Sequence, residues 1–515
     1  MQSDQLTNVY FVDQRLWMFG AFAEDDWKVT PKLTLNLGLR YDFATPALEA
    51  QNKLANFSPA GNGALVFASA GSIQQRALVQ PNKKDFGPRI GFAYSLDPQT
   101  VIRGGYGVYY TLFERIGSED QLGLNPPYLI NKTQASNAAP VLTPHIGFPA
   151  NFLDPTTINF NALQSFHIRT MNLNDPSPMV QQWSFGLQHE FAGQWLAELN
   201  YVGTHSTHLD VLSDFNQFLI SGNQVVVCPA GGTSGSIACT PGQPVVPYPN
   251  FGYIEYTNSN GSGKYNGLEA TLNRRFSKGL SVRFAYTYSR STDDAPEELE
   301  SNSGAAPNRN NLTGWYGPSD FDVPHRVALS YVYELPFGRG KQFLSNGIAS
   351  KIFGGFQTSG VFTYYSGHPF TVNEGGTLQS QLDLFGQSTA VPNVVGTPHV
   401  LGNPNCWFYI SINSACAGLA SGLTDPFQVT AGGVVGSSGR NTLRGPSTKV
   451  FDFALIREFP IQEKANVEFR WEVFNLTNTT LFGQPSGNIT SSGAGTITSL
   501  SGDPRVMQFA LRFSF

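Results

Sequence analysis

Apolar and polar residues alternate along much of this chain. The clearest stretch is 33–43, in which Leu33, Leu35, Leu37, Leu39, Tyr41 and Phe43 alternate with Thr34, Asn36, Gly38, Arg40 and Asp42. A period of two belongs to an extended strand, because successive side chains point to opposite faces. No helix separates these residues into two faces. The pattern predicts a strand with one apolar and one polar face.

The same alternation predicts thirteen strands. They are 15–29, 33–43, 86–96, 101–113, 180–191, 195–207, 265–276, 280–291, 323–335, 356–366, 449–459, 465–477 and 507–515. Connections between them alternate between short turns and long polar segments, except for a medium-length one after residue 335. An up-and-down meander with turns at one end and loops at the other has this order, whereas a soluble sandwich has no reason to separate loop lengths in this way.

The carboxyl-terminal stretch ends on an aromatic residue. Bacterial outer-membrane β-barrels end in such an alternating strand closed by Phe, and their assembly machinery reads that ending. The resemblance makes four residues a candidate assembly signal: Phe509, Leu511, Phe513 and Phe515. The last strand of a soluble sandwich is the alternative interpretation of these residues alone.

Composition agrees with membrane strands. Of 515 residues, 13% are charged, about half the soluble average, and 13% are aromatic. No apolar run approaches the roughly 20 residues of a membrane helix. We therefore expect an all-β fold, an antiparallel up-and-down transmembrane β-barrel with short periplasmic turns and long extracellular loops. The net charge of −5 and the lack of a basic patch exclude a nucleic-acid partner.

The number of strands is odd, whereas complete bacterial barrels have an even number. Residues 1–11 show neither a basic nor an apolar segment, so no signal peptide is expected there. The sequence therefore predicts that 1–515 is a single incomplete barrel domain, with further strands upstream.

The four cysteines lie in two local pairs, Cys228 with Cys239 and Cys406 with Cys416, each in a Gly-, Pro- and Ser-rich segment. Three connectivities are open, and the local one is favoured. Disulfides imply an oxidising compartment. The spacing does not match a zinc site, so we expect no metal.

Several segments resemble the Oar-like branch of TonB-dependent outer-membrane transporters. The matching residues are 25–41 (DDWKVTPKLTLNLGLRY), 88–94 (PRIGFAY), 103–107 (RGGYG), 331–338 (YVYELPFG), 439–446 (GRNTLRGP) and 503–506 (DPRV). The resemblance implies a 22-stranded barrel of the Gram-negative outer membrane. It also implies a plug, a regulatory-like domain and a TonB-contacting motif, none of which is visible in this sequence.

Four sets of residues could carry chemistry, and each has a structural alternative. His205, His208 and Asp210 could bind a metal, but a polar loop edge is favoured. The acidic run could bind calcium, but a solvated loop is favoured; it comprises Asp293, Asp294, Glu297, Glu298 and Glu300. Charges on the polar face could line a solute path, contact a plug or pair with one another; they are Arg40, Asp42, Glu269, Arg283, Glu468, Arg470, Glu472 and Arg512. Five tryptophans suit interfacial girdles: Trp17, Trp27, Trp183, Trp195 and Trp471.

The first functional hypothesis is that this chain forms a barrel segment of an outer-membrane TonB-dependent receptor for energised uptake of an unknown large solute. Outer-membrane lipid, the barrel assembly machinery and, through the missing part, the TonB complex are its expected partners. Long loops near 114–178, 208–262 and 367–446 are expected to capture the ligand. A structural or adhesive surface protein and a passive pore are the alternatives. No nucleophile has a catalytic neighbourhood, so we expect neither an enzyme nor a cofactor.

Overall fold

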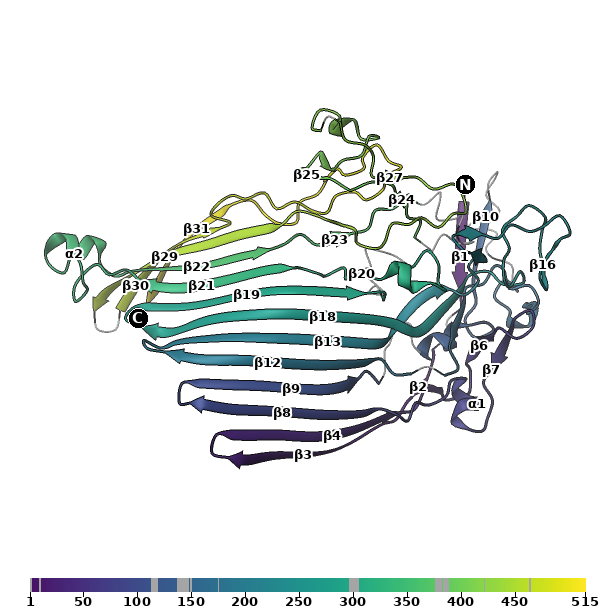
Figure 1. The fold of residues 1–515 in the computed structure, drawn as a ribbon, viewed down its shortest axis with the longest axis horizontal. Helices are drawn as coiled ribbons and strands as arrows, with labels where there is room; N and C mark the ends of the chain where they lie inside the picture. The colour runs from purple at the N-terminus through teal and green to yellow at the C-terminus, as the bar shows by residue number, and fades with distance from the viewer. Residues whose placement is uncertain are drawn as a thin grey trace.

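The computed structural model describes residues 2–8, 11–112, 119–136, 148, 151–174, 176–295, 305–375, 382, 389–420, 422–462 and 465–515. Thirteen long strands follow one another in a single antiparallel meander (Figure 1). The predicted number of strands and the all-β antiparallel fold are confirmed. In order they are β3 (Met18–Thr30), β4 (Leu33–Ala44), β8 (Phe86–Asp97), β9 (Thr100–Tyr110), β12 (Met179–Phe191), β13 (Trp195–Asp214), β18 (Ile254–Ser277), β19 (Leu280–Asp293), β21 (His325–Glu334), β22 (Phe356–Tyr365), β29 (Thr448–Gln462), β30 (Ala465–Phe474) and β31 (Val506–Ser514).

The sheet is open. Among the described residues, β3 pairs only with β4 and β31 only with β30, so each has one free edge. The tight turns lie together at the left of Figure 1, and the long connections form a layer of loops beyond the other strand ends, toward the right and the top of the view. This separation is the one that the order of the connections predicts.

The register gathers the apolar residues on one face. Leu329 of β21 lies between Phe284 of β19 and Phe362 of β22. The preceding residue, Ala328, lies on the other face, between Ala285 and Thr363. The same face that carries Leu329 carries Phe509 and Leu511, which are 70% and 74% exposed.

In the described part of the chain, no cluster of buried apolar residues covers the apolar face of the sheet. All five clusters of buried apolar residues in the described part of the chain consist mostly or wholly of residues of the loop layer. An apolar sheet face without a protein partner is stable in lipid, where apolar-out, polar-in alternation is the rule. None of the helices among the described residues is long and apolar enough to cross a membrane.

The loop layer is built from short elements. Its paired strands are β1 (Gln2–Thr7) with β10 (Asn131–Ser136), β2 (Gln14–Arg15) with β5 (Leu48–Glu49), β6 (Ala55–Ser58) with β7 (Ala64–Phe67), β14 (Ile220–Ser221) with β15 (Gln224–Val225), β16 (Thr233–Ser234) with β17 (Ile237–Ala238), β23 (Pro369–Phe370) with β28 (Leu443–Arg444), β24 (Asn393–Val394) with β27 (Phe427–Gln428), and β25 (Val400–Asn403) with β26 (Cys406–Phe408). Two further strands, β11 (Ile168–Met171) and β20 (Gly317–Pro318), extend the main sheet beside β18 and β19. The helical segments here are α1 (Ile73–Ala77), η1 (Glu119–Leu124), η2 (Pro155–Thr157), η3 (Leu312–Trp315) and η4 (Ser414–Cys416).

The structure differs from the sequence-based expectation at several strand boundaries and in one connection. The first strand begins at Met18 rather than at residue 15, because Arg15 pairs with β5 instead. Strands β13 and β18 continue past their predicted ends into the loop layer, where they pair with each other as far as Asp214 and Glu255. This pairing satisfies the backbone groups although the side-chain alternation has ended. The connection 335–355 contains a helix, α2 (Gly347–Phe353).

Two ion pairs, each with at least one buried member, hold the loop layer against the strand ends. Arg440 is 1% exposed, and its Nη2 donates to the Asp293 carbonyl at 2.7 Å and to the Asp293 carboxylate. Arg444 donates to the carbonyl and carboxylate of Asp322. Asn441 lies between the two arginines and donates to the Pro318 carbonyl at 2.8 Å. The segment 439–446 therefore holds the loop that precedes β28 against the end of β19 and against β20.

A lipid-facing charge tests the assignment of the two faces. We expect Leu329→Arg to destabilise the protein by about 2–4 kcal/mol, because it places a guanidinium at the centre of an apolar strand face in the bilayer. The matched variant Ala328→Arg places the same charge on the polar face and costs far less. Urea unfolding of the protein inserted in lipid vesicles measures both. Equal losses would contradict the assignment.

Candidate functional site

The loop layer contains a cavity of about 790 Å³. Four separate stretches of the chain form its walls, and each wall is neutral. The lining residues are Asn56, Phe57, Ser58, Pro59, Val66, Phe67, Ser69, Ser72, Gln74, Gln75, Leu78, Thr170, Met171, Asn172, Leu173, Phe215 and Tyr256. Among the described residues that line it, none is an acid, a base or a histidine. Apolar and aromatic walls with a few amides and hydroxyls are typical of small-molecule sites.

One wall is the hairpin of β6 and β7 followed by α1. The helix begins with a capping box. The Ser72 hydroxyl accepts a hydrogen bond from the backbone N–H of Gln75, and the side-chain oxygen of Gln75 accepts one from the backbone N–H of Ser72. This reciprocal cap fixes where so short a helix starts. It thereby places Ser72 and Gln75 at the cavity.

Asn56 joins this wall to the opposite one. It is 7% exposed, and its side-chain amide donates to the Met171 carbonyl at 3.1 Å and to the Leu78 carbonyl at 3.4 Å. Its amide oxygen accepts from the hydroxyl of Thr170 at 2.8 Å. A buried amide with all its partners is rigid, because an unmet hydrogen bond costs the full desolvation penalty. The cavity is therefore preformed on this side.

Aromatic rings form the far side, where β13 and β18 enter the loop layer. Phe215 makes an edge contact with Tyr256, with ring centroids 4.9 Å apart, and another with Phe57 at 5.7 Å. Outside the lining, the Arg309 guanidinium lies 4.4 Å from the Phe215 ring centroid. Burial lowers the pKa of Arg309 from its usual value, and the carboxylate of Asp214 opposes that shift. Arg309 thus stabilises the ring of Phe215 through a cation–π contact.

The two histidines that were predicted to lie at a polar loop edge lie in a strand and do not line the cavity. Both His205 and His208 lie within β13. His205 falls inside the predicted strand, and His208 lies one residue past its predicted end at residue 207. Asp210 accepts a hydrogen bond from the Ser259 hydroxyl at 2.6 Å across the β13–β18 pair. Within the described ranges, no group of three His, Cys, Asp or Glu residues could hold a metal ion.

The expectation of a solvated acidic loop is wrong for its first two members. Asp293 and Asp294 are buried, at 7% and 8% exposure. Asp293 pairs with Arg440, and Asp294 accepts from the Ser262 amide at 2.6 Å. Burial raises the pKa of Asp294, against the hydrogen bonds from Ser262. Glu297, Glu298 and Glu300 lie outside the described residues.

Charges on the polar face of the sheet pair in part. The Arg40 Nε lies 2.7 Å from a carboxylate oxygen of Asp42. The Arg470 Nε lies 2.9 Å from a carboxylate oxygen of Glu468, and its Nη1 lies 3.3 Å from one of Glu472. These contacts match the pairing interpretation. Three further charges make no ion pair with a described residue: Glu269, Arg283 and Arg512.

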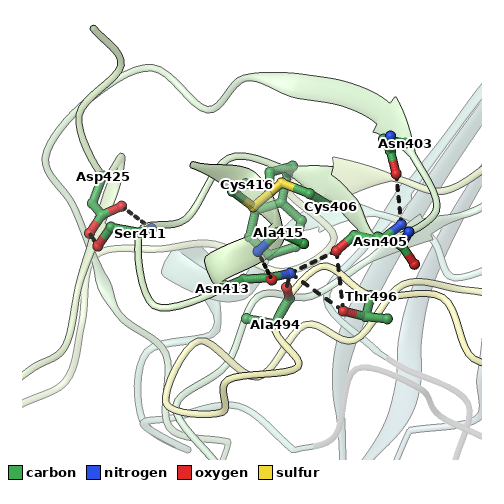
Figure 2. Close-up of a disulfide and its surroundings, with 11 residues drawn as sticks. Asn403, Asn405, Cys406, Ser411, Asn413, Ala415, Cys416, Asp425, Ala494 and Thr496 are labelled. Atoms are coloured by element: carbon green, nitrogen blue, oxygen red, sulfur yellow. Dashed lines mark hydrogen bonds between the residues drawn. A yellow bond between two sulfur atoms is a disulfide. The ribbon is translucent and has the colours of Figure 1, made fainter. Parts of the chain in front are cut away.

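Both cysteine pairs are disulfides in the structure, Cys228–Cys239 and Cys406–Cys416. Figure 2 shows the second one beside Asn413, whose amide donates to the carbonyls of Asn405 and Ala494 at 2.8 and 2.7 Å. Cys406 and Cys416 are fully buried in the largest apolar cluster, whereas Cys239 is half-buried. The two bridges therefore differ in access to solvent.

The sequence predicted no cavity, but two of the loops expected to capture ligand, 114–178 and 208–262, supply part of its lining, whereas residues 56–78 lie outside those loops. The walls of the cavity come from residues 56–78, 170–173, 215 and 256, which only the loop packing brings together. The one local signal was the Ser72–Gln75 capping box, which predicts a helix start and not a site.

The chain matches one protein family and is similar in fold to several solved outer-membrane proteins. A family model described as an outer membrane beta barrel domain matches residues 1–508. No curated protein matches the chain. Among solved structures, the chain is similar to the outer membrane transporter YddB from Escherichia coli, with 11% identity, a TM-score of 0.45, and coverage of 97% of this chain and 45% of that one. It is also similar to the ferripyoverdine receptor of Pseudomonas aeruginosa, with 12% identity, a TM-score of 0.42, and coverage of 98% and 39%. A third is the siderophore receptor PirA from Acinetobacter baumannii, with 11% identity, a TM-score of 0.41, and coverage of 97% and 46%. The chain spans less than half the length of each of these proteins.

The two disulfides should differ in their reaction with a reductant. We expect a mild thiol reductant to open Cys228–Cys239 first, because one of its sulfurs belongs to a half-buried residue and thiolate attack needs access. Native-state alkylation followed by peptide mass spectrometry measures the order. In denaturant both bridges should open together, which is the control. Earlier opening of Cys406–Cys416 in the folded protein would contradict the burial argument.

Proposed function

The chain belongs to the outer membrane beta barrel domain family, and from that premise we propose that it is the barrel portion of a TonB-dependent receptor that captures a solute for energised uptake. Family membership places it in the outer membrane of a Gram-negative bacterium, as the sequence predicted. The segments resembling Oar-like transporters support the proposal, and so does the loop cavity, which is the single observation that points to ligand capture.

The proposal also accounts for the two free edges of the sheet. Unpaired strand edges within a bilayer leave backbone groups without partners, at a cost of several kcal/mol for each group. We propose that further strands of one barrel domain join the free edges of β3 and β31. The proposed complete barrel has about 22 strands, the number found in plugged outer-membrane transporters. The proposed signal for the assembly machinery is the carboxyl-terminal end of the chain, with Phe509, Leu511 and Phe513 in β31 and Phe515 directly after it.

The lining of the cavity indicates the class of solute. An ionised group that enters an uncharged cavity loses water without gaining a counter-charge, which is unfavourable. Rings such as Phe57 and Phe215 offer apolar faces, and the exposed amides and hydroxyls offer hydrogen bonds. We therefore propose an uncharged, partly apolar solute.

Two dyes that share one aromatic framework test this class: N-phenyl-1-naphthylamine, which is neutral, and its sulfonated anion, 8-anilinonaphthalene-1-sulfonate. With the protein in lipid nanodiscs and empty nanodiscs subtracted, we expect the neutral dye to bind at least about tenfold more tightly, a difference of about 1.4 kcal/mol. Leu173→Lys should reverse the preference, because it adds a cation to a lining residue that is 43% exposed.

The control is Leu419→Lys, which makes the same change at a residue 47% exposed and outside the cavity lining. It should bind both dyes as the unchanged protein does. If the unchanged protein binds the anion as tightly as the neutral dye, or if Leu173→Lys behaves like Leu419→Lys, the proposed ligand class is wrong.

Energised uptake needs a separate experiment in cells that carry the complete receptor. Solutes retained by the purified protein from conditioned medium, and lost by Leu173→Lys, are identified by mass spectrometry. We expect these solutes to accumulate in cells only while the proton-motive force is present, and to remain bound at the surface when a protonophore removes it. Binding with no accumulation under either condition would favour the structural or adhesive alternative. Accumulation that ignores the protonophore would favour a passive pore.

A further inference from the structure

The connection 335–355 is unusual among the turns at its end of the sheet. The neighbouring strands are joined by tight turns, such as residues 31–32, 98–99 and 278–279. This connection instead carries the helix α2, which projects at the left of Figure 1 beyond the strand ends. A longer segment with its own helix needs a physical reason to be ordered there, because fixing each residue costs conformational entropy.

The segment leaves several large apolar side chains about half exposed or more. Ile348 is 77% exposed, Ile352 is 51% exposed and Phe353 is 54% exposed. Ile348 and Ile352 are four residues apart, so they share one face of α2. Before the helix, Phe343 and Leu344 are 49% and 45% exposed. Clustered exposure of this kind marks a contact surface rather than scattered surface residues.

Arg457 of β29 places this surface at the apolar face of the sheet. Its position in the register lies opposite Phe356 of β22 and Phe469 of β30, on the face that contacts lipid. Its Nη1 donates to the Ile352 carbonyl at 2.7 Å, and its Nη2 donates to the Lys351 carbonyl. A cation at the last carbonyls of a helix is a favourable cap. The helix end is thus attached to the outside of the sheet.

Exposed apolar residues of β29 continue beyond the residue that contacts the helix. Beyond Arg457, toward the turn, Phe459 lies opposite Val467 on the same face and is 40% exposed, and Ile461 is 58% exposed. The apolar surface of the barrel therefore continues past the level at which β29 contacts the helix. An apolar helix face at that level meets the boundary between acyl chains and headgroups, not bulk water.

The charge of the segment fits an anionic headgroup layer. Residues 335–355 contain Arg339, Lys341 and Lys351 and no acidic residue. Lys341 pairs with Glu334 at 2.6 Å, whereas Arg339 and Lys351 make no ion pair with a described residue. Basic residues beside an exposed apolar face are the signature of interfacial segments, which bind anionic lipid.

We propose that the segment 343–353 lies in the phospholipid leaflet at the short-turn end of the barrel, with Ile348, Ile352 and Phe353 among the acyl chains and Arg339 and Lys351 at anionic phosphate headgroups. It anchors this end of the barrel at a fixed depth. The occupant is the membrane already in contact with the adjoining strand face, and the proposal does not depend on which solute the loops capture.

A fluorescent label tests the location. Ile348→Cys is labelled with a nitrobenzoxadiazole dye, and the protein is inserted in vesicles of phosphatidylcholine with one quarter phosphatidylglycerol. We expect a blue-shifted emission that falls by at least half when the lipids carry bromine on their acyl chains. The same label at Leu419→Cys, in the loop layer, should show water-like emission and no quenching. A shift of electrophoretic mobility on heating verifies that each labelled protein is folded.

Charge reversal tests the headgroup contact. Arg339→Glu combined with Lys351→Glu should reduce quenching of the label at residue 348 in vesicles with phosphatidylglycerol, and should have little effect in phosphatidylcholine alone. Water-like emission at residue 348 in every vesicle would overturn the proposal. So would a label that is shielded in native outer membranes but not in vesicles of pure lipid, since that result would indicate a protein partner instead.

Discussion

The structure depends on one constraint, which is that an apolar sheet face must contact lipid while every backbone group inside the bilayer finds a partner in a neighbouring strand. The register meets both demands at once, since each strand presents residues such as Leu329 and Leu511 on one face and pairs along both edges. The exceptions are the outer edges of β3 and β31 in the described chain. Those edges are where the fold as described has unmet hydrogen-bonding capacity.

Because the bilayer takes the place of a core for the sheet, the loops have to build their own. Small apolar clusters do so, and polar anchors hold them in position. Arg440 is buried against Asp293, and Asn56 ties two walls of the cavity together. Removing one member of such a pair leaves an unpaired polar group in an apolar surrounding, which costs more than the pair itself contributes. The loop layer can therefore be long in sequence and still preformed in shape.

The two ends of the sheet face different surroundings and have different surfaces. At the loop end, neutral walls around Phe215 and Tyr256 enclose a space of small-molecule size. At the turn end, Ile348 and Ile352 project from a helix attached to the outer face by Arg457. One end has the properties expected for selecting a solute from water, and the other has those of a segment resting on lipid. The same strands connect them, so the depth of the barrel in the membrane also sets the height of the cavity above it.

The sequence by itself determined the strands, because the period of two is a local property that each segment carries without help from the others. Thirteen strands, their order and the assignment of faces follow from residues such as Leu33–Phe43 and the terminal Phe515. Three things were decided only by the tertiary structure. The continuation of β13 and β18 depends on their pairing with each other, and the burial of Asp293 and Asp294 depends on partners far along the chain, such as Arg440. The cavity depends on four loop segments meeting, since loop conformation is set by contacts between distant residues rather than by periodicity.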